Sequence, residues 1–366
     1  MDRGRARAFG LSIGHFPTGE RNAITDVTGV RVGHATVVRD PGGDLRHAVR
    51  TGVTAVFPHE GLPWKERVYV GTHVLNGYGE MIGTYQLNEW GILHSPVVLT
   101  SSLAIGRAYD ATARWMARHP EGVGDMPVVS ECDDSFLNDA TSFPLAEEDV
   151  WEALDGARGG DVSEGCVGAG TGMQCFDFKG GIGTSSRVLP DDAGGFTVGA
   201  LVLTNFGERH DLRVDGVPVG REIPDLMPES SPPDGSCVVV VATDAPMLPH
   251  QVRRLAVRAG LGLGRTGSVA TNGSGELMIA FSTANRIPAG AEEKHMPVEA
   301  LIDGPPDDVP TVFTQLFAAT VEAVEEAVLN ALFTAETTTG VDGNTLHALP
   351  IDRTLELLEK AGRLSD

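Results

Sequence analysis

Basic residues are scarce in this chain. Its 366 residues include 28 Lys and Arg against 50 Asp and Glu, which gives a formal net charge of −22. A nucleic-acid-binding protein needs a basic surface to neutralise phosphates, so this balance argues against nucleic acid as a partner. It argues equally against an anionic membrane surface. The charge does not by itself identify a reaction.

Cysteine is also rare, and long hydrophobic runs are absent. None of the four cysteines stands in a C-x-x-C pair, so we expect neither a structural zinc site nor a disulfide framework. No apolar stretch reaches the 18 residues that a membrane-spanning helix requires. The first ten residues are basic but lack the apolar segment of a secretory signal. A reducing, cytoplasmic location is the simplest expectation.

Short catalytic motifs are missing as well, including G-x-S-x-G, H-E-x-x-H and the phosphate-binding P-loop. Residues 262–267 formally match G-x-G-x-x-G. However, a helix rather than a strand is expected before them, and no acidic residue follows at the required offset. The 11 histidines are scattered and form no ligand pair at helical spacing. We therefore expect neither a metal nor an organic cofactor.

Glycine, in contrast, is abundant, with 46 residues in segments that otherwise look ordered. We expect these glycines to form tight turns and close backbone approaches. Strand patterns occur at 53–59, 95–101, 126–132, 195–206, 236–246 and 276–282, and helix patterns at 76–90, 103–118, 249–260, 311–334 and from residue 350. Long buried strands mixed with amphipathic helices predict a layered α/β fold, with sheets inside and helices outside.

The most informative junction lies between Gly235 and Ser236. Residues 223–235 hold four prolines and several acids, which predicts an exposed, poorly packed linker. They meet the strand-like segment SCVVVVATDAP without a transition. If Ser236 became N-terminal, its own α-amine could act as the base, because that amine has a reference pKa of about 7.7–8.0. From the local pattern alone, an ordinary loop-to-strand boundary is the simpler interpretation.

Longer segments of the chain resemble one known family. They are NAITDVTGVRVGHATV, RTGVTAVFP, NGYGEMIG, GAGTGMQCFDFKGGIGTSSRV, SCVVVVATDAP and TNGSGELMIAFSTAN. In order and spacing they resemble the L-aminopeptidase D-Ala-esterase/amidase family, which includes the β-peptidyl aminopeptidases. The resemblance runs from about residue 22 to the C-terminal helix, so it is far more specific than any short motif.

The resemblance implies a single peptidase domain over residues 1–366. Its fold would be a four-layer α-β-β-α sandwich like that of N-terminal-nucleophile hydrolases. It also implies self-cleavage into an α chain, residues 1–235, and a β chain, residues 236–366. Members typically assemble as tetramers of such α/β pairs, so we expect a homo-oligomer. The expected substrates are short peptides, amides or esters with a free amino end.

Carried over residue by residue, the resemblance makes Ser236 the nucleophile. It makes Ser274 and Glu276 the polar partners that hydrogen-bond near it, and Asn205 a donor to the oxyanion. A carboxylate beside a second serine could orient the nucleophile and hold a nearby ammonium, and a side-chain amide could stabilise a developing oxyanion. Without the resemblance, Ser274 and Glu276 would be interpreted as a polar turn and Asn205 as the cap of a strand end.

Glu131 aligns with the acid thought to hold the free amine of the substrate. Its alternative is a solvated charge at a strand end. Two positions later family members usually carry an aromatic residue, a tyrosine in some, but this chain has Asp133. The oxyanion hole would then lack one donor and the pocket would be more acidic. We therefore expect a shifted substrate preference, toward a cationic or longer amine.

Two other functions stay open at this point. One is a related amidase or cyclic-amide hydrolase that does not require a free amine. The other is a non-catalytic homologue that never cleaves itself.

Overall fold

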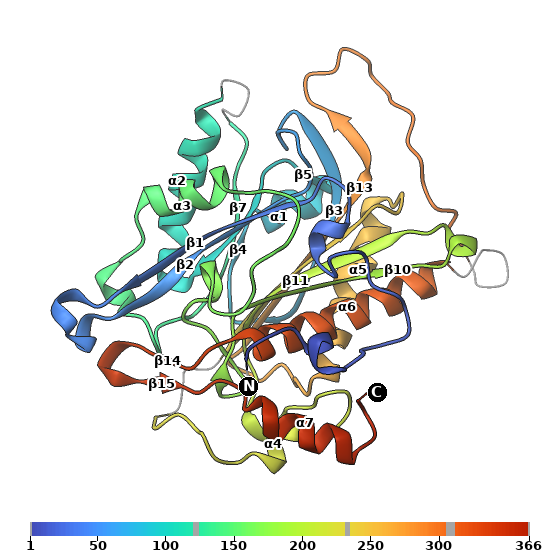
Figure 1. Ribbon diagram of the computed structural model, residues 1–366. Helices are drawn as coiled ribbons and strands as arrows, with labels where there is room; N and C mark the ends of the chain where they lie inside the picture. Colours follow the sequence, from blue (N-terminus) through green and yellow to red (C-terminus); the bar gives the residue numbers. More distant parts are fainter. Residues whose placement is uncertain (1, 120–123, 231–234, 305–311, 365–366) are drawn as a thin grey trace.

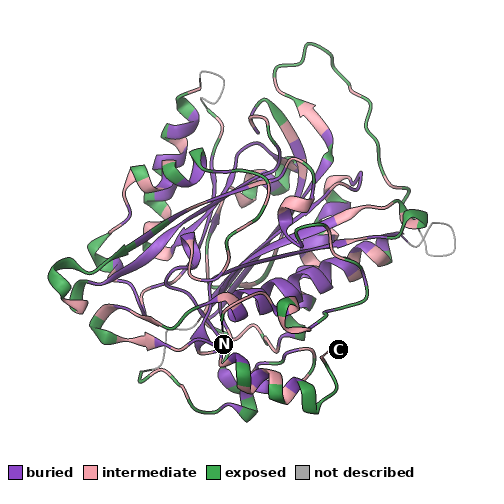
Figure 2. Ribbon diagram, in the orientation of Figure 1, coloured by how far each residue is buried: buried purple, intermediate pink, exposed green. Residues whose placement is uncertain are grey.

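Two β-sheets packed face to face form the centre of the molecule, with helices on both outer faces (Figure 1). The computed structural model describes residues 2–119, 124–230, 235–304 and 312–364. The order of layers is helix, sheet, sheet, helix, which confirms the fold expected from the resemblance. Figure 2 shows that both sheets are largely buried.

The first sheet has five strands in the order β1-β2-β6-β7-β4. Their bounds are Arg31–Arg39 (β1), Val49–Phe57 (β2), Val97–Ser101 (β6), Val128–Cys132 (β7) and Met81–Ile82 (β4). Helices α2 (Ile105–Ala117) and α3 (Glu147–Asp155) cover its outer face and bury one cluster of apolar side chains. Strands β6 and β7 run parallel, so their carboxyl ends, at Ser101 and Cys132, lie side by side.

The second sheet has six strands in the order β10-β11-β12-β13-β3-β5. Their bounds are Ile182–Val188 (β10), Thr197–Asn205 (β11), Ser236–Thr243 (β12), Gly275–Pro288 (β13), Glu66–Gly77 (β3) and Ile92–Leu93 (β5). Helices α5 (Pro249–Arg265) and α6 (Val312–Thr334) cover this sheet. Smaller elements are β8 (Gln174–Cys175), β9 (Phe178–Lys179), β14 (Thr338–Thr339), β15 (Thr345–Leu346), α1 (Thr84–Trp90), α4 (Val219–Glu222) and α7 (Ile351–Lys360).

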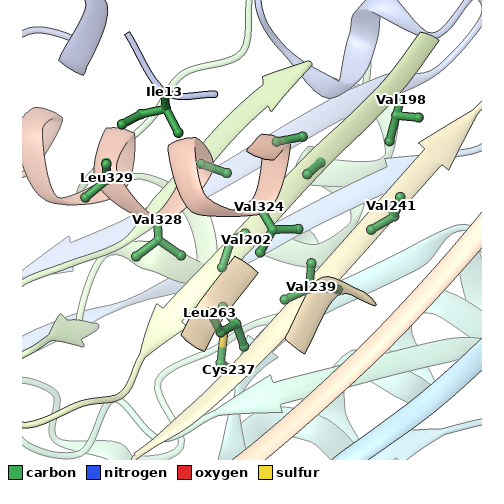
Figure 3. Close-up of a cluster of buried hydrophobic side chains, with 14 of the residues drawn as sticks. Ile13, Val198, Val202, Cys237, Val239, Val241, Leu263, Val324, Val328 and Leu329 are labelled. Carbon is green, nitrogen blue, oxygen red and sulfur yellow. The ribbon is translucent and has the colours of Figure 1, made fainter. Parts of the chain in front are cut away.

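Alternation along β12 allows one strand to contribute to two cores. Val238 and Val240 lie in the cluster between the two sheets. Val239 and Val241 point to the opposite face and pack in the cluster that includes Val324 of α6 (Figure 3). All eight residues of β12 are buried, which explains why the segment reads as a continuous apolar run rather than an alternating one. Burial of each valine stabilises the fold by roughly 1.5–3 kcal/mol.

The helix predicted at 76–90 is wrong in its first half. Strand β3 continues to Gly77, a turn and the short strand β4 follow, and α1 begins only at Thr84. Pairing with β13 extends β3, because Asn76 is paired with Glu276 and Gly77 with Gly275. Gly83 has a φ of 97°, a conformation that delays the start of the helix. The helical spacing of apolar residues was outweighed by hydrogen bonding to a neighbouring strand.

The linker predicted at 223–235 is exposed over much of its length, but its first part is firmly attached. The guanidinium of Arg209 donates to the carbonyl oxygens of Ile223, Asp225 and Leu226. Arg353 of α7 adds two hydrogen bonds to the Asp225 carboxylate, each 2.7 Å long. The poor packing expected from composition therefore does not apply to residues 223–226. Residues 231–234 lie outside the described part of the chain.

Candidate active site

The junction between Gly235 and Ser236 lies at the start of β12, in the middle of the six-stranded sheet. Ser236 is paired with Asn205 of β11 on one side and with Gly275 of β13 on the other. Ser236 is 5% exposed, and its hydroxyl makes no hydrogen bond of normal geometry to the residues that the structure describes; the polar group beside it is the buried thiol of Cys132, a weak hydrogen-bonding group. Buried hydroxyls nearly always have a partner, so this one calls for a functional explanation.

Gly235 occupies a position that no larger residue fits. A Cβ atom there would lie 2.2 Å from the carbonyl oxygen of Asn205 and 2.7 Å from the Cα of Phe206. The carbonyl oxygen of Gly235 accepts a hydrogen bond from the backbone N–H of Gly275, at 3.2 Å. The peptide bond that precedes Ser236 is therefore held close to the sheet, with its carbonyl polarised by a backbone donor.

Asn205 is the last residue of β11, and its side chain lies on the same face of the sheet as Ser236, because directly paired antiparallel residues share a face. The side chain is nearly buried, and its Oδ1 accepts a hydrogen bond from the backbone N–H of Gln174, at 3.2 Å. This contact identifies the oxygen and leaves the amide nitrogen as a donor next to Ser236. The geometry fits the oxyanion role that the resemblance implies for Asn205.

Glu131 is contributed by the other sheet, near the end of β7. One of its carboxylate oxygens accepts from the backbone N–H of Glu80, at 2.8 Å, and the other accepts from the hydroxyl of Ser102. Burial raises the pKa of Glu131, although the Ser102 and Glu80 hydrogen bonds oppose the shift. No Lys or Arg of the described residues forms an ion pair with it, so a cation from solution would find an uncompensated carboxylate.

A single cavity of ≈ 660 Å³ joins these groups. It is lined by Gly77, Tyr78, Gly79, Ser102, Leu103, Glu131, Asp133, Ser135, Gly235 and Ser236. These residues come from the ends of β3, β6, β7 and β12, so both sheets contribute to the cavity. Its volume is in the range of pockets that bind small molecules. The structure therefore brings the expected nucleophile, scissile residue and amine-binding acids to one site.

Asp133 also faces this cavity, at the position where the resemblance leads us to expect an aromatic residue. Its Oδ1 accepts from the backbone N–H of Ser135, at 2.8 Å, and its Oδ2 accepts from the Ser135 hydroxyl, at 2.9 Å. Both hydrogen bonds come from neutral donor groups of Ser135. They fix the orientation of the carboxylate without neutralising its charge.

Ser274 and Glu276 lie next to each other but line a different, very small cavity. The Ser274 hydroxyl donates to Glu276 Oε1, while Glu276 Oε2 has no partner in the described part of the protein. Burial raises the pKa of Glu276, and the Ser274 hydrogen bond only partly opposes this. The structure shows no hydrogen bond from either residue to the Ser236 hydroxyl. Their link to the nucleophile is through Gly275, which stands between them and is paired with Ser236.

Four contributors were missed at the sequence level. The backbone N–H of Gly275 acts on Gly235, the backbone N–H of Gln174 acts on Asn205, and the backbone N–H of Glu80 and the hydroxyl of Ser102 act on Glu131. Three of the four are backbone groups, which carry no signal in a sequence. Ser102 directly follows the predicted strand at 95–101, but only the parallel pairing of β6 and β7 in the structure places it beside Glu131.

The fold and the site together define a hydrolase of the N-terminal-nucleophile type, with a serine at the start of a central strand. The profile of peptidase family S58 matches residues 22–346. The chain belongs to this family, and it is therefore a serine peptidase of the aminopeptidase and amidase class.

Known relatives agree with this assignment. The β-peptidyl aminopeptidase BapA of Sphingosinicella microcystinivorans is 43% identical over 99% of this chain and 93% of its own length. The crystal structure of the L-aminopeptidase D-Ala-esterase/amidase of Ochrobactrum anthropi, described as a variant of the Ntn hydrolase fold, matches with a TM-score of 0.90 and 43% identity over 99% of each chain. A β-aminopeptidase of a Burkholderia species matches with a TM-score of 0.89 and 40% identity, over 98% of this chain and 99% of its own.

In the described ranges, no helix has the length and apolar character needed to cross a lipid bilayer. Within the same ranges, His, Cys, Asp and Glu side chains form no group of three or more that could hold a metal ion.

Proposed function

We propose that this protein cleaves its own Gly235–Ser236 bond and then acts as an aminopeptidase with Ser236 as nucleophile. The observation that carries the proposal is the unpartnered Ser236 hydroxyl. It is buried directly after a position where only glycine fits, and it lies in the same cavity as the amine-binding candidate Glu131. The products would be an α chain of residues 1–235 and a β chain of residues 236–366.

Self-cleavage would begin when Ser236 Oγ attacks the carbonyl carbon of Gly235. The hydroxyl proton moves to the departing backbone nitrogen of Ser236, and the peptide bond becomes an ester. Water then hydrolyses the ester, which leaves a carboxylate on Gly235 and a free amine on Ser236. The Gly275 N–H already contacts the Gly235 oxygen and would stabilise the negative charge that develops there.

Substrate turnover would use the new terminus. The α-amine of Ser236, with a reference pKa of about 7.7–8.0, takes the proton from its own hydroxyl as Oγ attacks the substrate carbonyl. The proton passes to the leaving amine, an acyl ester forms on Ser236, and water releases the acid. Asn205 donates to the oxyanion in both steps. In subtilisin, loss of one such side-chain donor lowers kcat by about 10²–10³-fold.

Glu131 would select substrates with a free amino end. Its carboxylate is held in one orientation by two donors and faces the cavity without a cationic partner in the described structure. An ammonium bound there would place the adjacent carbonyl near Ser236. Short peptides, amides and esters fit this arrangement, in line with the names of the β-peptidyl aminopeptidase and L-aminopeptidase relatives.

Ser274 and Glu276 would act on the liberated amine rather than on the hydroxyl. Their direct neighbour Gly275 is paired with Ser236, and Glu276 keeps one carboxylate oxygen free. A carboxylate in this position favours an ammonium nearby and restricts where the amine can lie. No metal or organic cofactor enters any step.

We also propose a tetramer of α/β pairs, following the family, and a cytoplasmic location. Exposed apolar side chains support assembly. They include Val74 and Leu75 of β3, Tyr85 and Trp90 of α1, and Leu261 of α5, and both helices contact β3. Four free cysteines are consistent with a reducing compartment.

The test is intact-mass analysis of the wild-type protein beside Ser236→Ala, with a hydrolysis assay on both. We expect two wild-type fragments that separate at Gly235–Ser236, and a single inactive 38.6 kDa chain for the variant. A wild-type protein that stays one chain would support the non-catalytic homologue instead. Equal turnover of a free and an N-acetylated aminoacyl amide would support the amidase without a free-amine requirement.

A further inference from the structure

The cavity that holds Ser236 contains two carboxylates and, among the described residues that line it, no Lys, Arg or His. Glu131 alone suffices to bind the amine of an aminopeptidase substrate. Asp133 is therefore a second negative charge in the same space, and neither residue forms an ion pair in the described structure. Two uncompensated like charges in one partly desolvated cavity repel each other, so the arrangement is unfavourable until a cation binds.

Hydrogen bonds hold the Asp133 carboxylate in one orientation. Ser135 donates to both of its oxygens, from the backbone at 2.8 Å and from the hydroxyl at 2.9 Å. Each carboxylate oxygen keeps a further acceptor position, because a carboxylate accepts about four hydrogen bonds in all. A fixed, charged acceptor that lines the same cavity as the unpartnered nucleophile has the properties of a specificity group.

We infer that Asp133 binds a second cation on the substrate, so that the preferred acyl group is a diamino acid whose side chain ends in an ammonium. This inference rests on the proposed function, because it takes the amine at Glu131 and the carbonyl at Ser236 as given. Glu131 lies in the last part of β7 and Asp133 directly follows the strand, and both side chains line the same cavity. A single substrate with two ammonium groups joined by an aliphatic chain could therefore contact both carboxylates.

Apolar surface in the cavity supports the same class of substrate. Tyr78 and Leu103 line it and are 74% and 51% exposed. Lysine side chains typically lay their methylene groups along such surface while the charged end reaches a polar partner. A purely acidic pocket would favour a small, fully hydrated cation. The combination of two carboxylates with two apolar side chains favours an aliphatic dication.

The experiment compares lysine p-nitroanilide with norleucine p-nitroanilide, which has the same chain length but no side-chain ammonium. Both the α-amino and the β-homo forms of the pair are used, because the inference does not depend on backbone type. With self-processed wild-type enzyme we expect kcat/KM for the lysine substrate to exceed that for norleucine by about tenfold or more in the better form. In Asp133→Asn, which preserves size, we expect that ratio to fall by about tenfold, mainly through KM for the lysine substrate.

Asp139→Asn is the matched control. Asp139 also accepts a hydrogen bond from a hydroxyl two residues later, Thr141 Oγ1, at 3.0 Å, but its other oxygen contacts His47 Nδ1 at 3.2 Å and it does not line the cavity. The control removes the same charge, so a preference caused only by the overall −22 charge would change equally in both variants. We expect Asp139→Asn to keep the wild-type ratio.

Three results overturn the inference, and each is distinguishable from failure of the proposed function. They are norleucine hydrolysed as fast as lysine, an unchanged ratio in Asp133→Asn, and the same fall in Asp139→Asn. In each case a cleaved enzyme that turns over norleucine still supports the aminopeptidase itself. A chain that neither cleaves itself nor hydrolyses any of the four substrates overturns both.

Discussion

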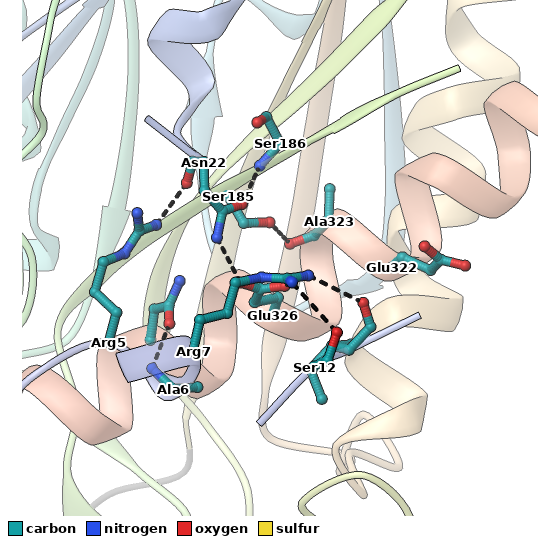
Figure 4. A network of polar contacts seen from close by, with 12 residues as sticks. Arg5, Ala6, Arg7, Ser12, Asn22, Ser185, Ser186, Glu322, Ala323 and Glu326 are labelled. Carbon is teal, nitrogen blue, oxygen red and sulfur yellow. Dashed lines mark hydrogen bonds and ion pairs between the residues drawn. The ribbon is translucent and has the colours of Figure 1, made fainter. Parts of the chain in front are cut away.

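Two buried polar clusters in this molecule differ in how completely their polar atoms are hydrogen-bonded. One lies beneath α6, where Arg187 and Glu326 are both fully buried and Glu326 is hydrogen-bonded to Arg187, Arg7 and Asn22. Figure 4 shows Glu326 with Arg7 and Asn22. The other surrounds Ser236. In the first cluster both Glu326 oxygens are bonded, by Arg7 at 2.7 and 2.8 Å and by Arg187 at 2.7 Å. In the second, Ser236 Oγ and Glu276 Oε2 have no partner in the described structure.

The pKa shifts of the two glutamates reflect this difference. Burial acts to raise the pKa of Glu326, but the hydrogen bonds from Arg7 and the charge of Arg187 outweigh it, and the pKa is lowered. Burial likewise raises the pKa of Glu276, and a single serine does not reverse the shift. A fully bonded buried cluster holds parts of the fold together, whereas a partly bonded one is poised for a ligand or a reaction. The comparison predicts different outcomes for substitutions in the two clusters.

The largest effect is expected for Ser236→Ala. Removal of the hydroxyl should abolish processing and lower amide hydrolysis by at least about 10⁴-fold, because both steps use the same nucleophile. Since that hydroxyl has no partner, the melting temperature should change little. Gel electrophoresis, an amide assay and calorimetry measure the three quantities. A strongly lowered Tm would show that Ser236 is structural and would remove the contrast between the clusters.

Glu326→Gln should show the reverse pattern, with activity per folded molecule preserved and stability lost. The substitution leaves buried Arg187 without one of its charged partners, and such a loss costs about 3–5 kcal/mol. Because folding lowers its pKa, Glu326 stabilises the protein above its unfolded pKa of about 4.3, and this contribution disappears as the pH falls. Urea unfolding across pH should therefore show a gap between wild type and variant that narrows in acid. A gap that is independent of pH contradicts the ion-pair explanation.

Asn205→Asp tests whether the amide nitrogen beside Ser236 is a catalytic donor. The variant keeps an oxygen acceptor for the Gln174 N–H, which is 3.2 Å from Oδ1, removes the amide donor and places a carboxylate beside Ser236. We expect kcat to fall by about 10²–10³-fold. Because position 205 is nearly buried, the new carboxylate should also lower the thermal midpoint, so the rate is compared per folded molecule. Retention of rate within a few-fold would assign Asn205 to support of the Gln174 loop alone.

The smallest effect is a gain in stability from Glu276→Gln. Folding raises the pKa of Glu276, so its ionised form opposes folding at neutral pH, and a neutral amide removes that opposition. We expect the free energy of unfolding to rise by up to about 1 kcal/mol at pH 7, with no gain below the unfolded pKa. Activity should fall in the same variant. Lost stability at pH 7 would mean that Glu276 resembles Glu326, and the two clusters would no longer differ in kind.

Much of the fold could be predicted because its strands and helices have strong local patterns. The strand at 236–243 and the helix at 312–334 are apolar enough to be recognised without any tertiary information. The prediction of a helix over residues 76–90 was wrong in its first half because it relied on the local pattern alone. Strand β3 was missed and the helix was placed too early, because pairing of Asn76 and Gly77 with β13 is a long-range contact that the local pattern does not contain.

For the candidate site, too, the sequence identified individual residues, whereas only the structure showed which of them lie together. Ser236, Glu131, Asp133 and Asn205 were named from the sequence, and the structure brings them to the facing ends of strands from two sheets. Their grouping could not be derived from spacing, because about 100 residues of sequence separate Glu131 from Ser236. Ser274 and Glu276 were also named, but the structure places them behind Gly275 and on a separate cavity.

The sequence by itself determined the layered fold, the glycine before the nucleophile and the identity of the charged groups. Each of these depends on residue type and local periodicity. Only the tertiary structure decided which charges remain uncompensated. Glu326 and Glu131 are both buried carboxylates, but two arginines from distant segments reach the first and no basic side chain of the described protein pairs with the second. Compensation depends on what the folded chain brings within hydrogen-bond distance, and no single segment encodes that.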